Sequence, residues 1–205
     1  NWAVGAPFQL QAGSTFEGSG TGARWGDYSS TTRDPADPGS FWVTNEYMHN
    51  VAASGLTANQ NWATQVVEVI PTIAGEVRWK NPAAGSFATA TNWQTGAAPG
   101  SGDHVIFSRW SGISYQVDVP TTANDRLSVR QTGTGTVRFN IASGATWSLT
   151  NTDPTQPSLS IAEFQGQSNV MFSGGGTLQS NFAIIAGQSG GTGNLTIDGT
   201  GTTWN

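Results

Sequence analysis

The hydrophobic residues in the second half of the chain lie in short runs that are separated by polar, glycine-rich turns. Between residues 113 and 205, a strand-like run of four to six residues is repeatedly followed by a turn of Gly, Thr and Ser. The runs lie at residues 115–119, 126–130, 136–141, 146–150, 168–172, 176–180, 183–186 and 194–198. Strands this short cannot each bury a core of their own. The pattern therefore predicts a β-solenoid, in which two or three strands form each layer of roughly 20 to 25 residues.

Residues 1–72 differ from this repetitive part, because they are rich in aromatic residues and polar turns. Short hydrophobic runs predict strands here, at residues 2–4, 8–10, 25–29, 41–47 and 62–70. The last run gives the clearest signal, because its two faces differ in polarity as in a half-buried strand. Two prolines and a glycine at residues 34–39 predict a turn of fixed geometry. The region is predicted to be a short β-rich module.

Residues 73–112 form a junction between these two regions. Aromatic residues recur there between turns, at Trp79, Phe87, Trp93 and Phe107. A stack of strands exposes apolar side chains and unpaired backbone at its first layer, so it needs a cap at that end. The sequence therefore predicts three parts: a β-rich module at 1–72, a junction and cap at 73–112, and solenoid repeats at 113–205.

The composition indicates an ordered chain that carries few charges. Only 10% of the 205 residues are charged, against roughly 25% in ordinary soluble domains. Nine Trp and nine Phe distinguish the chain from a disordered one. The net charge is −5 and the eight Lys and Arg residues form no run, so no nucleic-acid partner is expected. No apolar run approaches the length of a membrane helix, so membrane insertion is not expected either.

The chain contains no cysteine. This excludes disulfides, thiolate zinc sites and cysteine nucleophiles. Together with the abundance of Thr, Ser, Gly and Asn and the scarcity of lysine, it favours an extracellular or bacterial cell-surface location. The chain starts at Asn1, and a strand-like run is still in progress at Asn205. We therefore expect a processed or excised part of a longer protein.

Two stretches resemble known families. The first combines RWGDYS at 24–29, DPAD at 34–37, FWVTNEY at 41–47 and NWATQ at 61–65. It resembles the closing segment of secreted bacterial repeat proteins, the last blade of a β-propeller-like domain. The resemblance implies a structural role for this segment.

The second resemblance covers residues 79 to 205. Its opening consists of Trp79, Phe87, Asn92, Trp93, Gly96, Pro99, Gly102, Asp103 and the run 105–107. This spacing resembles the opening of autotransporter-passenger-like and PEP-CTERM-associated repeat regions, and GNLTIDG at 193–199 followed by GTTW at 201–204 is similar to their repeat unit. The resemblance implies a right-handed parallel β-helix on the outside of a bacterium, serving display, adhesion or surface assembly.

Four carboxylates lie close together in the first region, at Asp27, Asp34, Asp37 and Glu46. Such a group could perform acid–base catalysis or bind calcium through its oxygens. The proline turn, however, accounts for its own two aspartates. The chain contains neither a spaced Asp-x-Asp-x-Asp-Gly loop nor a Gly-Gly-x-Gly-x-Asp repeat. No metal site and no cofactor is predicted.

The two histidines, His49 and His104, fall in different regions without a Ser or Cys beside them to complete a catalytic triad. Asp103 is expected to cap a turn. β-Helix lyases and hydrolases gather charged residues on one sheet face, but from residue 113 onward there is no lysine, and the carboxylates are only Asp118, Asp125, Asp153, Glu163 and Asp198. No catalytic residue is assigned and the protein is predicted not to be an enzyme. A polysaccharide lyase or hydrolase acting through Asp118 or Asp125 is the least favoured alternative.

Aromatic residues offer a second kind of candidate chemistry, because Trp and Tyr present flat apolar faces to sugar rings. The candidate contacts for a glycan or a protein partner are Trp25, Trp42, Tyr47, Trp62, Trp110 and Tyr115. Core packing is instead expected for Trp79, Trp93, Trp147 and Trp204.

These observations predict a non-enzymatic, extracellular structural protein that builds or extends a bacterial surface fibre, sheath or adhesin. An uncapped last layer would leave strand edges unpaired, and few lysines are present to prevent edge pairing. Copies of the chain are therefore predicted to associate head to tail, as a homo-oligomer or a filament. The alternative is a carbohydrate-binding adhesin module whose exposed aromatic residues contact surface glycans.

Overall fold

The computed structural model describes residues 29–34, 40–48, 62–69, 71, 73–81, 83–108, 112–130, 133–163, 166–187 and 190–205. The chain divides into two compact units, residues 1–34 with 39–71 and residues 35–38 with 72–205. Within the described residues, the regular structure consists of β-strands and one 3₁₀ turn, η2, at Ala90–Asn92. The prediction of an all-β protein is confirmed.

The first unit contains a three-stranded antiparallel sheet in the order β1-β2-β3. Its strands are β1 Ser30–Arg33, β2 Phe41–Met48 and β3 Trp62–Val69. The strands predicted at 41–47 and 62–70 are confirmed to within one residue. The sequence pattern does not predict β1, because this strand contains no apolar residue. The strands predicted at 2–4 and 8–10, and all but Ser29 of the third, lie outside the described residues.

The second unit consists of three sheets in which neighbouring strands are parallel. The β4–β15 sheet contains β4 Glu76–Arg78, β6 His104–Phe107, β9 Arg126–Val129, β12 Leu159–Ile161 and β15 Ala183–Ile185. The β5–β16 sheet contains β5 Gly85–Ser86, β7 Tyr115–Val119, β10 Thr136–Ile141, β13 Gly166–Ser173 and β16 Gly191–Ile197. The β8–β17 sheet contains β8 Thr122–Asn124, β11 Thr146–Leu149, β14 Thr177–Ser180 and β17 Thr203–Trp204.

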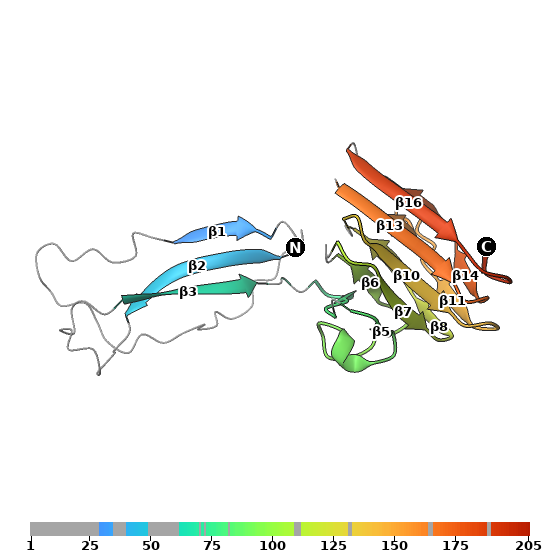
Figure 1. Ribbon diagram of the computed structural model, residues 1–205, viewed down its shortest axis with the longest axis horizontal. Helices are drawn as coiled ribbons and strands as arrows, with labels where there is room; N and C mark the ends of the chain where they lie inside the picture. The colour runs from blue at the N-terminus through green and yellow to red at the C-terminus, as the bar shows by residue number, and fades with distance from the viewer. Residues whose placement is uncertain are drawn as a thin grey trace, which may run out of the picture. The chain divides into compact units, whose positions relative to one another are not determined.

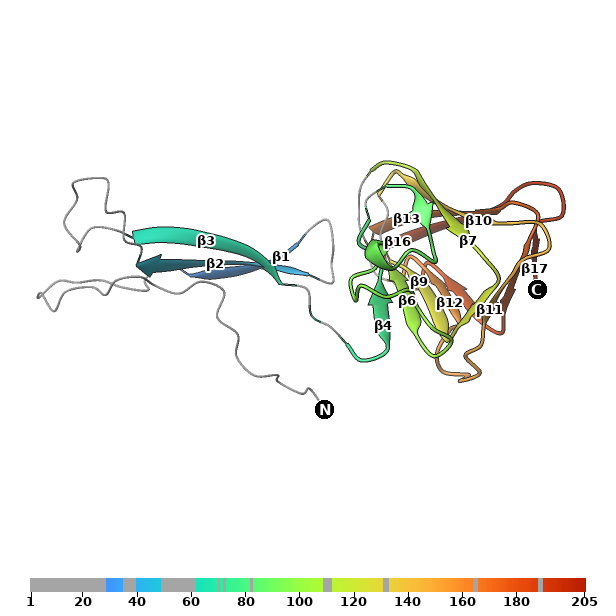
Figure 2. The same ribbon diagram turned by 90° about the horizontal axis from the view of Figure 1, so that it is seen from below.

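Successive strands enter the three sheets in rotation (Figure 1). β7, β8 and β9 lie in three different sheets, and β10, β11 and β12 then pair with them in the same order. β13, β14 and β15 form the next layer, and β16 and β17 the last. Figure 2 shows the three sheets arranged around one interior. The predicted parallel pairing of successive layers is thus present.

The layers differ in length. Along the β5–β16 sheet, Tyr115 pairs with Val137, which pairs with Val170, which pairs with Leu195. These pairs are separated by 22, 33 and 25 residues. The longest layer includes residues 153–157, which form the predicted loop and contain no strand. The expected layer of roughly 20 to 25 residues therefore describes two of these three intervals.

One hydrophobic core joins the inward faces of the three sheets. In the β4–β15 sheet, for example, Val105, Leu127 and Leu159 are in register and fully buried. Aromatic rings occupy the centre of the core. The ring of Phe139 lies 4.8 Å from that of Phe107, 5.2 Å from Trp147 and 5.3 Å from Phe172, between centroids. The first two pairs meet edge to face, which aromatic rings prefer.

Aromatic side chains of the junction close the first layer of this core. Trp79 and Phe87 are 2% exposed and Trp93 is fully buried. The ring of Trp93 lies 5.0 Å from that of Trp79 and 4.9 Å from that of Phe87. Its Nε1 donates a hydrogen bond of 2.7 Å to the carbonyl oxygen of Phe87. The core positions predicted for Trp79, Trp93 and the equally buried Trp147 are confirmed.

The backbone of the junction also covers one edge of the first strand. The N–H of Trp79 donates to Ile106 of β6, whereas the carbonyl of Arg78 and the N–H of Lys80 bond to residues 94 and 92. Alternate residues of a strand direct their backbone groups to opposite sides. Residues 92–94 therefore lie along the edge of β4 that faces away from β6.

Candidate functional site

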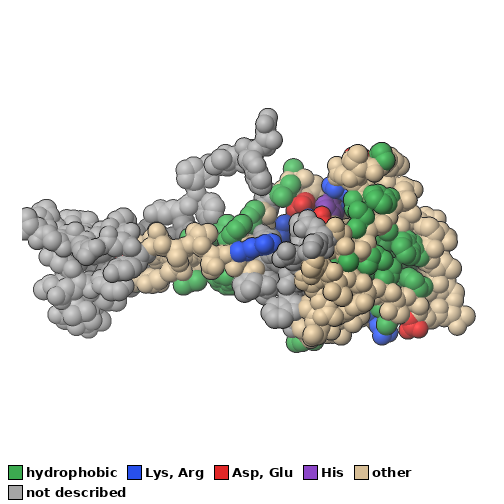
Figure 3. Space-filling model, turned by 90° about the horizontal axis from the view of Figure 1, so that it is seen from above, with side chains coloured by type: hydrophobic (Ala, Val, Ile, Leu, Met, Phe, Trp, Pro, Cys, Tyr) green, Lys and Arg blue, Asp and Glu red, His purple; other side chains and the backbone are tan. Residues whose placement is uncertain are grey.

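The last strands of the three sheets form an open end of the stack. Within the described residues, β15, β16 and β17 each have a neighbouring strand on one side only. Four large apolar side chains lie on these strands or beside them and are substantially exposed: Phe182 41%, Ile185 39%, Ile197 40% and Trp204 38%. Figure 3 shows hydrophobic side chains gathered on this end. We call these four residues the open-end cluster.

Three members of the open-end cluster continue columns of the core. Ile185 is in register with Ile161, Ile197 with Phe172, and Trp204 with Leu178, and all three earlier residues are fully buried. The same column position is thus buried in one layer and about two-fifths exposed in the next. The predicted core position of Trp204 is wrong, because no described layer covers it. Its indole Nε1 donates instead to Ser180 Oγ at 2.7 Å.

The open end is also almost free of charge. Between residues 164 and 205 the sequence contains one charged side chain, that of Asp198. Exposed edge strands in soluble proteins usually carry charged residues, especially lysine, or a proline, which oppose pairing with another chain. β15, β16 and β17 contain neither. This end therefore lacks the ordinary chemical protection against further strand pairing.

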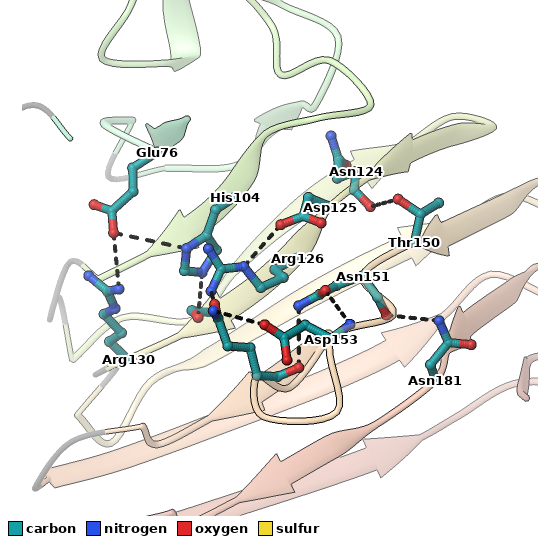
Figure 4. Close-up of polar contacts among 12 residues, drawn as sticks. Glu76, His104, Asn124, Asp125, Arg126, Arg130, Thr150, Asn151, Asp153 and Asn181 are labelled. Carbon is teal, nitrogen blue, oxygen red and sulfur yellow. Dashed lines mark hydrogen bonds and ion pairs between the residues drawn. The ribbon is translucent and has the colours of Figure 1, made fainter. Parts of the chain in front are cut away.

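A largely buried group of polar residues lies on the face of the β4–β15 sheet that points away from the core, and Figure 4 shows three of them, Glu76, His104 and Arg130. It contains Glu76, Arg78, His104, Ser128, Arg130 and Glu163, and we call it the polar column. Val105 and Phe107 point into the core, so strand alternation directs His104 outward. His104 is nevertheless only 6% exposed and Ser128 only 2%.

Hydrogen bonds and ion pairs connect the polar column across successive strands. Glu76 Oε2 accepts from Arg78 Nη2 at 3.1 Å, and its Oε1 lies 3.5 Å from Arg130 Nη2. Arg130 Nε donates to Glu163 Oε2 at 2.9 Å. His104 Nε2 lies 2.7 Å from Ser128 Oγ. These contacts connect β4, β6, β9 and the segment that follows β12, so they bind layers together.

Burial, and to a smaller extent the cationic side chains of Arg126, Arg130 and Arg78, together lower the pKa of His104 from 6.5 to about 3. The imidazole is therefore neutral at neutral pH. Glu76 Oε1 lies 3.9 Å from His104 Nδ1 and would favour the charged ring. Its effect is outweighed, because the same carboxylate already pairs with two arginines.

The order Ser128, His104, Glu76 is that of a nucleophile, a base and an acid in a serine hydrolase. The geometry does not suit this chemistry. The distance from Nδ1 to Oε1, 3.9 Å, is too long for a hydrogen bond, and a base works best when its pKa lies near the working pH. The polar column is better suited to stabilising the stack. Sequence reasoning missed the contact of His104 with Ser128, which lies 24 residues away and is brought beside it by strand register.

Two of the six aromatic candidates have side chains that the structure describes, Trp42 in the first unit and Tyr115 in the second. Trp42 lies on β2 and is 37% exposed, whereas Tyr115 begins β7 and is only 7% exposed. Tyr47 and Trp62 lie in β2 and β3, but their side chains are outside the described part of the structure, as are the whole residues Trp25 and Trp110. No two of these six side chains are described within one unit.

An open depression of about 300 Å³ lies at the start of β7 and β10. It is lined by Ser114, Tyr115, Gln116, Thr136, Arg138 and Met171. Arg138 is exposed on the outer face of the β5–β16 sheet, and no described residue forms an ion pair with it. Tyr115 is thus a wall of a polar depression, and its ring is not presented as an open stacking surface.

The candidate carboxylates have ordinary structural partners. Asp118 Oδ1 accepts from Gln116 Nε2 at 2.7 Å and from Asn140 Nδ2 at 2.9 Å, while Asp125 pairs with Arg126 at 3.0 Å. As predicted, Asp103 caps its turn, accepting from the N–H of Gly100 at 2.7 Å. Hydrogen bonds from the side chain and the backbone of Thr155 lower the pKa of Asp153.

The other carboxylates of the early group are only partly described. Asp34 is buried beside Ser40. Glu46 lies in β2, and Asp27 and Asp37 fall outside the described residues. Within the described ranges, no three His, Asp or Glu side chains are placed to hold a metal ion.

Comparison with protein families, with curated proteins and with solved structures finds no match to this chain. In the part of the chain that the structure describes, no helix has the length and apolar character needed to cross a membrane. The class of protein that the fold defines is an all-β protein with parallel sheets, and its function has to be argued from its surfaces.

Proposed function

We propose that the second unit is a right-handed parallel β-helix and that the protein is an extracellular structural component of a bacterial surface fibre, sheath or adhesin. The rotation of successive strands through three parallel sheets supports the β-helix. Connections between parallel strands of one sheet are right-handed in nearly all proteins, which supports the handedness. The resemblance of residues 79–205 to autotransporter-passenger-like and PEP-CTERM-associated repeats points to the same architecture.

The open end is the observation that carries the proposed role in assembly. Ile185, Ile197 and Trp204 occupy columns that are fully buried one layer earlier, yet they remain about two-fifths exposed. The strands beside them offer unpaired backbone groups to a further strand. A surface with exposed core side chains and free strand edges is suited to receive another β-layer. We propose that a β-layer of the same fold supplies it, and the association experiment below tests whether a second copy of the chain can do so.

The magnitude of the apolar burial is sufficient for association. Covering the open-end cluster removes roughly 300 Å² of apolar surface per copy, which is worth about 8 kcal/mol at 25 cal/mol per Å². When both copies contribute, this gain is comparable with the roughly 4–15 kcal/mol that association costs in lost freedom. Hydrogen bonds between strand edges add to it. The proposed contact is therefore strong enough to measure and weak enough to be reversible.

Association of the purified chain over a wide concentration range tests this proposal. We expect sedimentation velocity and light scattering to show reversible oligomers or fibres. Ile197→Lys should abolish them, because it would place an unpaired ammonium in an apolar contact, at a cost of several kcal/mol. Ile113→Lys is the matched control, since Ile113 is 68% exposed and lies outside the open end. A parent protein that stays monomeric at every concentration would exclude self-assembly.

A second candidate function, glycan binding by an adhesin module, is favoured by the depression around Arg138. Its hydroxyl, amide and guanidinium groups could bind the hydroxyls and a carboxylate of an acidic sugar. A glycan array is probed with the parent protein, Arg138→Ala and Trp42→Ala. It distinguishes binding in the depression from binding at the exposed ring of Trp42. Binding that is lost only with Arg138→Ala would assign it to the depression, and absence of binding by the parent would remove this candidate.

A further inference from the structure

We propose that the depression around Arg138 binds one acidic unit of a glycan whose neighbouring units are uncharged, and that Asp118 disfavours glycans with a carboxylate on every unit. This inference rests on the glycan binding proposed above as the second candidate function, and it names the class of glycan. It follows from the contacts of the side chains in the depression and from the distribution of charge over the β5–β16 sheet.

The guanidinium of Arg138 is available to a ligand. Arg138 is exposed on β10, and no hydrogen bond or ion pair within the described ranges involves its side chain. A guanidinium binds a carboxylate through two parallel hydrogen bonds. Ser114 and Thr136 add hydroxyls to the walls, and Ser114 Oγ accepts from the N–H of Thr136 at 3.0 Å, which leaves its own proton to donate. A carboxylate partner thus lies beside groups that bind hydroxyls, as an acidic sugar requires.

The rest of the β5–β16 sheet carries almost no charge. Its five strands contain two charged residues, Arg138 and Asp118. Strand alternation directs the residues between buried core positions outward. On β13 and β16, which follow β10 in the sheet, the outward residues include Gln167, Asn169, Met171, Thr192, Asn194 and Thr196. One acidic unit therefore finds a cation on this face, and the units beside it find uncharged groups.

Asp118 lies beside the depression on the same face. It is in register with Asn140, whereas Arg138 is in register with Gln116, so the two charged residues are one strand and two residues apart. The ordinary strand spacing and rise place their Cα atoms roughly 8 Å apart, which is within the screening length of about 10 Å at 0.1 M salt. Asp118 Oδ1 accepts from the side chains of Gln116 and Asn140. Its carboxylate is thus fixed near the bound acid without occupying the guanidinium.

This arrangement distinguishes glycans by the spacing of their charges. When every unit carries a carboxylate, the first can bind Arg138, but the sheet offers no second cation to the next. A carboxylate near Asp118 is repelled, and two unit charges roughly 6 Å apart in water change an affinity about threefold. When the neighbouring units are uncharged, this repulsion is absent. Asp118 is therefore a specificity-determining residue, and Arg138 supplies the affinity.

Titration calorimetry with oligogalacturonates of equal length tests the inference. One probe is fully acidic and the other is methyl-esterified on about half of its units, so the two differ in charge spacing on the same sugar. A hyaluronan oligosaccharide, in which acidic and neutral units alternate, is the third probe. The readout is the ratio of the affinity for the half-esterified probe to that for the fully acidic probe. Comparing this ratio between proteins cancels the unequal number of binding units on the two probes.

We expect Asp118→Asn to lower this ratio about threefold, because the amide keeps an acceptor for Gln116 and Asn140 but carries no charge. Raising the salt concentration should lower the ratio of the parent in the same direction. Asp153→Asn is the matched control, since it removes one negative charge from the loop before β12 and should leave the ratio unchanged. Arg138→Ala should weaken binding of all three probes about tenfold or more. Circular dichroism shows whether each variant has folded.

The outcomes separate this inference from the proposed glycan binding. A ratio that falls with Asp118→Asn and stays constant with Asp153→Asn supports the selection by charge spacing. Equal ratios in the parent and Asp118→Asn overturn it, and glycan binding stands if Arg138→Ala still abolishes it. Absence of binding to all three probes overturns both.

Discussion

Acid should destabilise the second unit through His104. In the folded protein, burial and three neighbouring arginines lower the pKa of this imidazole from 6.5 to about 3. Between these two pH values the unfolded chain binds a proton that the folded chain does not. The stability associated with the neutral imidazole is therefore fully present above pH 6.5 and is lost progressively as the pH falls toward 3. The loss is about 1.4 kcal/mol per pH unit for one proton.

His104→Gln isolates this effect, because glutamine can keep a hydrogen bond to Ser128 without titrating. Urea unfolding of both proteins at about pH 7 and about pH 5 gives the free energy of unfolding at each pH. The fluorescence of the buried Trp79, Trp93 and Trp147 follows the second unit. Between the two conditions, wild type should lose about 2 kcal/mol more than the variant. The carboxylates titrate in both proteins, so their contribution cancels in the difference.

The same experiment can refute the reasoning. Equal pH dependence of wild type and His104→Gln would mean that the folded protein accepts the imidazolium. The description of a buried histidine among arginines would then be incorrect. Ser128→Ala serves as the matched control, since it removes the hydrogen-bond partner but leaves the titrating ring in place. This variant should keep the steep wild-type loss of stability in acid.

Two further predictions concern stability and are checked by urea or thermal unfolding. Asn124 is fully buried, and its Oδ1 accepts a hydrogen bond of 2.9 Å from Trp147 Nε1. Asn124→Ala should therefore lower the free energy of unfolding by about 2–4 kcal/mol. The control Asn140→Ala, at the sheet surface, should lower it by less than about 1 kcal/mol. Equal effects would contradict the buried hydrogen bond. Gly174 has a φ of 99°, and a Cβ added there would clash with the backbone oxygen of Ile141 in the preceding layer. Gly174→Ala should therefore lower the free energy of unfolding by about 3 kcal/mol. Gly144→Ala, with φ of 79° and open space around it, should cost about 1 kcal/mol, and a smaller loss at Gly174 would refute the close approach.

The strands of the repetitive region could be predicted because they carry a local signal. β7 and β10 have the predicted bounds, 115–119 and 136–141, and the predictions for β9 and β11 extend one residue too far. In these strands apolar residues face the core and the residues between them face outward. β8 and β12 were missed because each has only three residues and includes polar ones, whereas β15, also of three residues, is apolar throughout and was predicted at 183–186.

The polar column could not be predicted, because its members are far apart in the sequence. Arg130 reaches Glu76 across 54 residues, and Ser128 meets His104 across 24. Which residues meet depends on how many residues each layer contains, and the loops between strands change that number. Strand register therefore decides these contacts, and no local sequence pattern indicates the register.

The sequence by itself determined that this protein is all-β, built from short strands and poor in charge, because side-chain alternation, turn residues and composition act locally. Only the tertiary structure decided that successive strands rotate through three parallel sheets and which polar groups meet. It also decided that the first layer is sealed while Trp204 and its neighbours stay exposed. The physical reason is that burial depends on the layer above, which each strand's own residues do not specify.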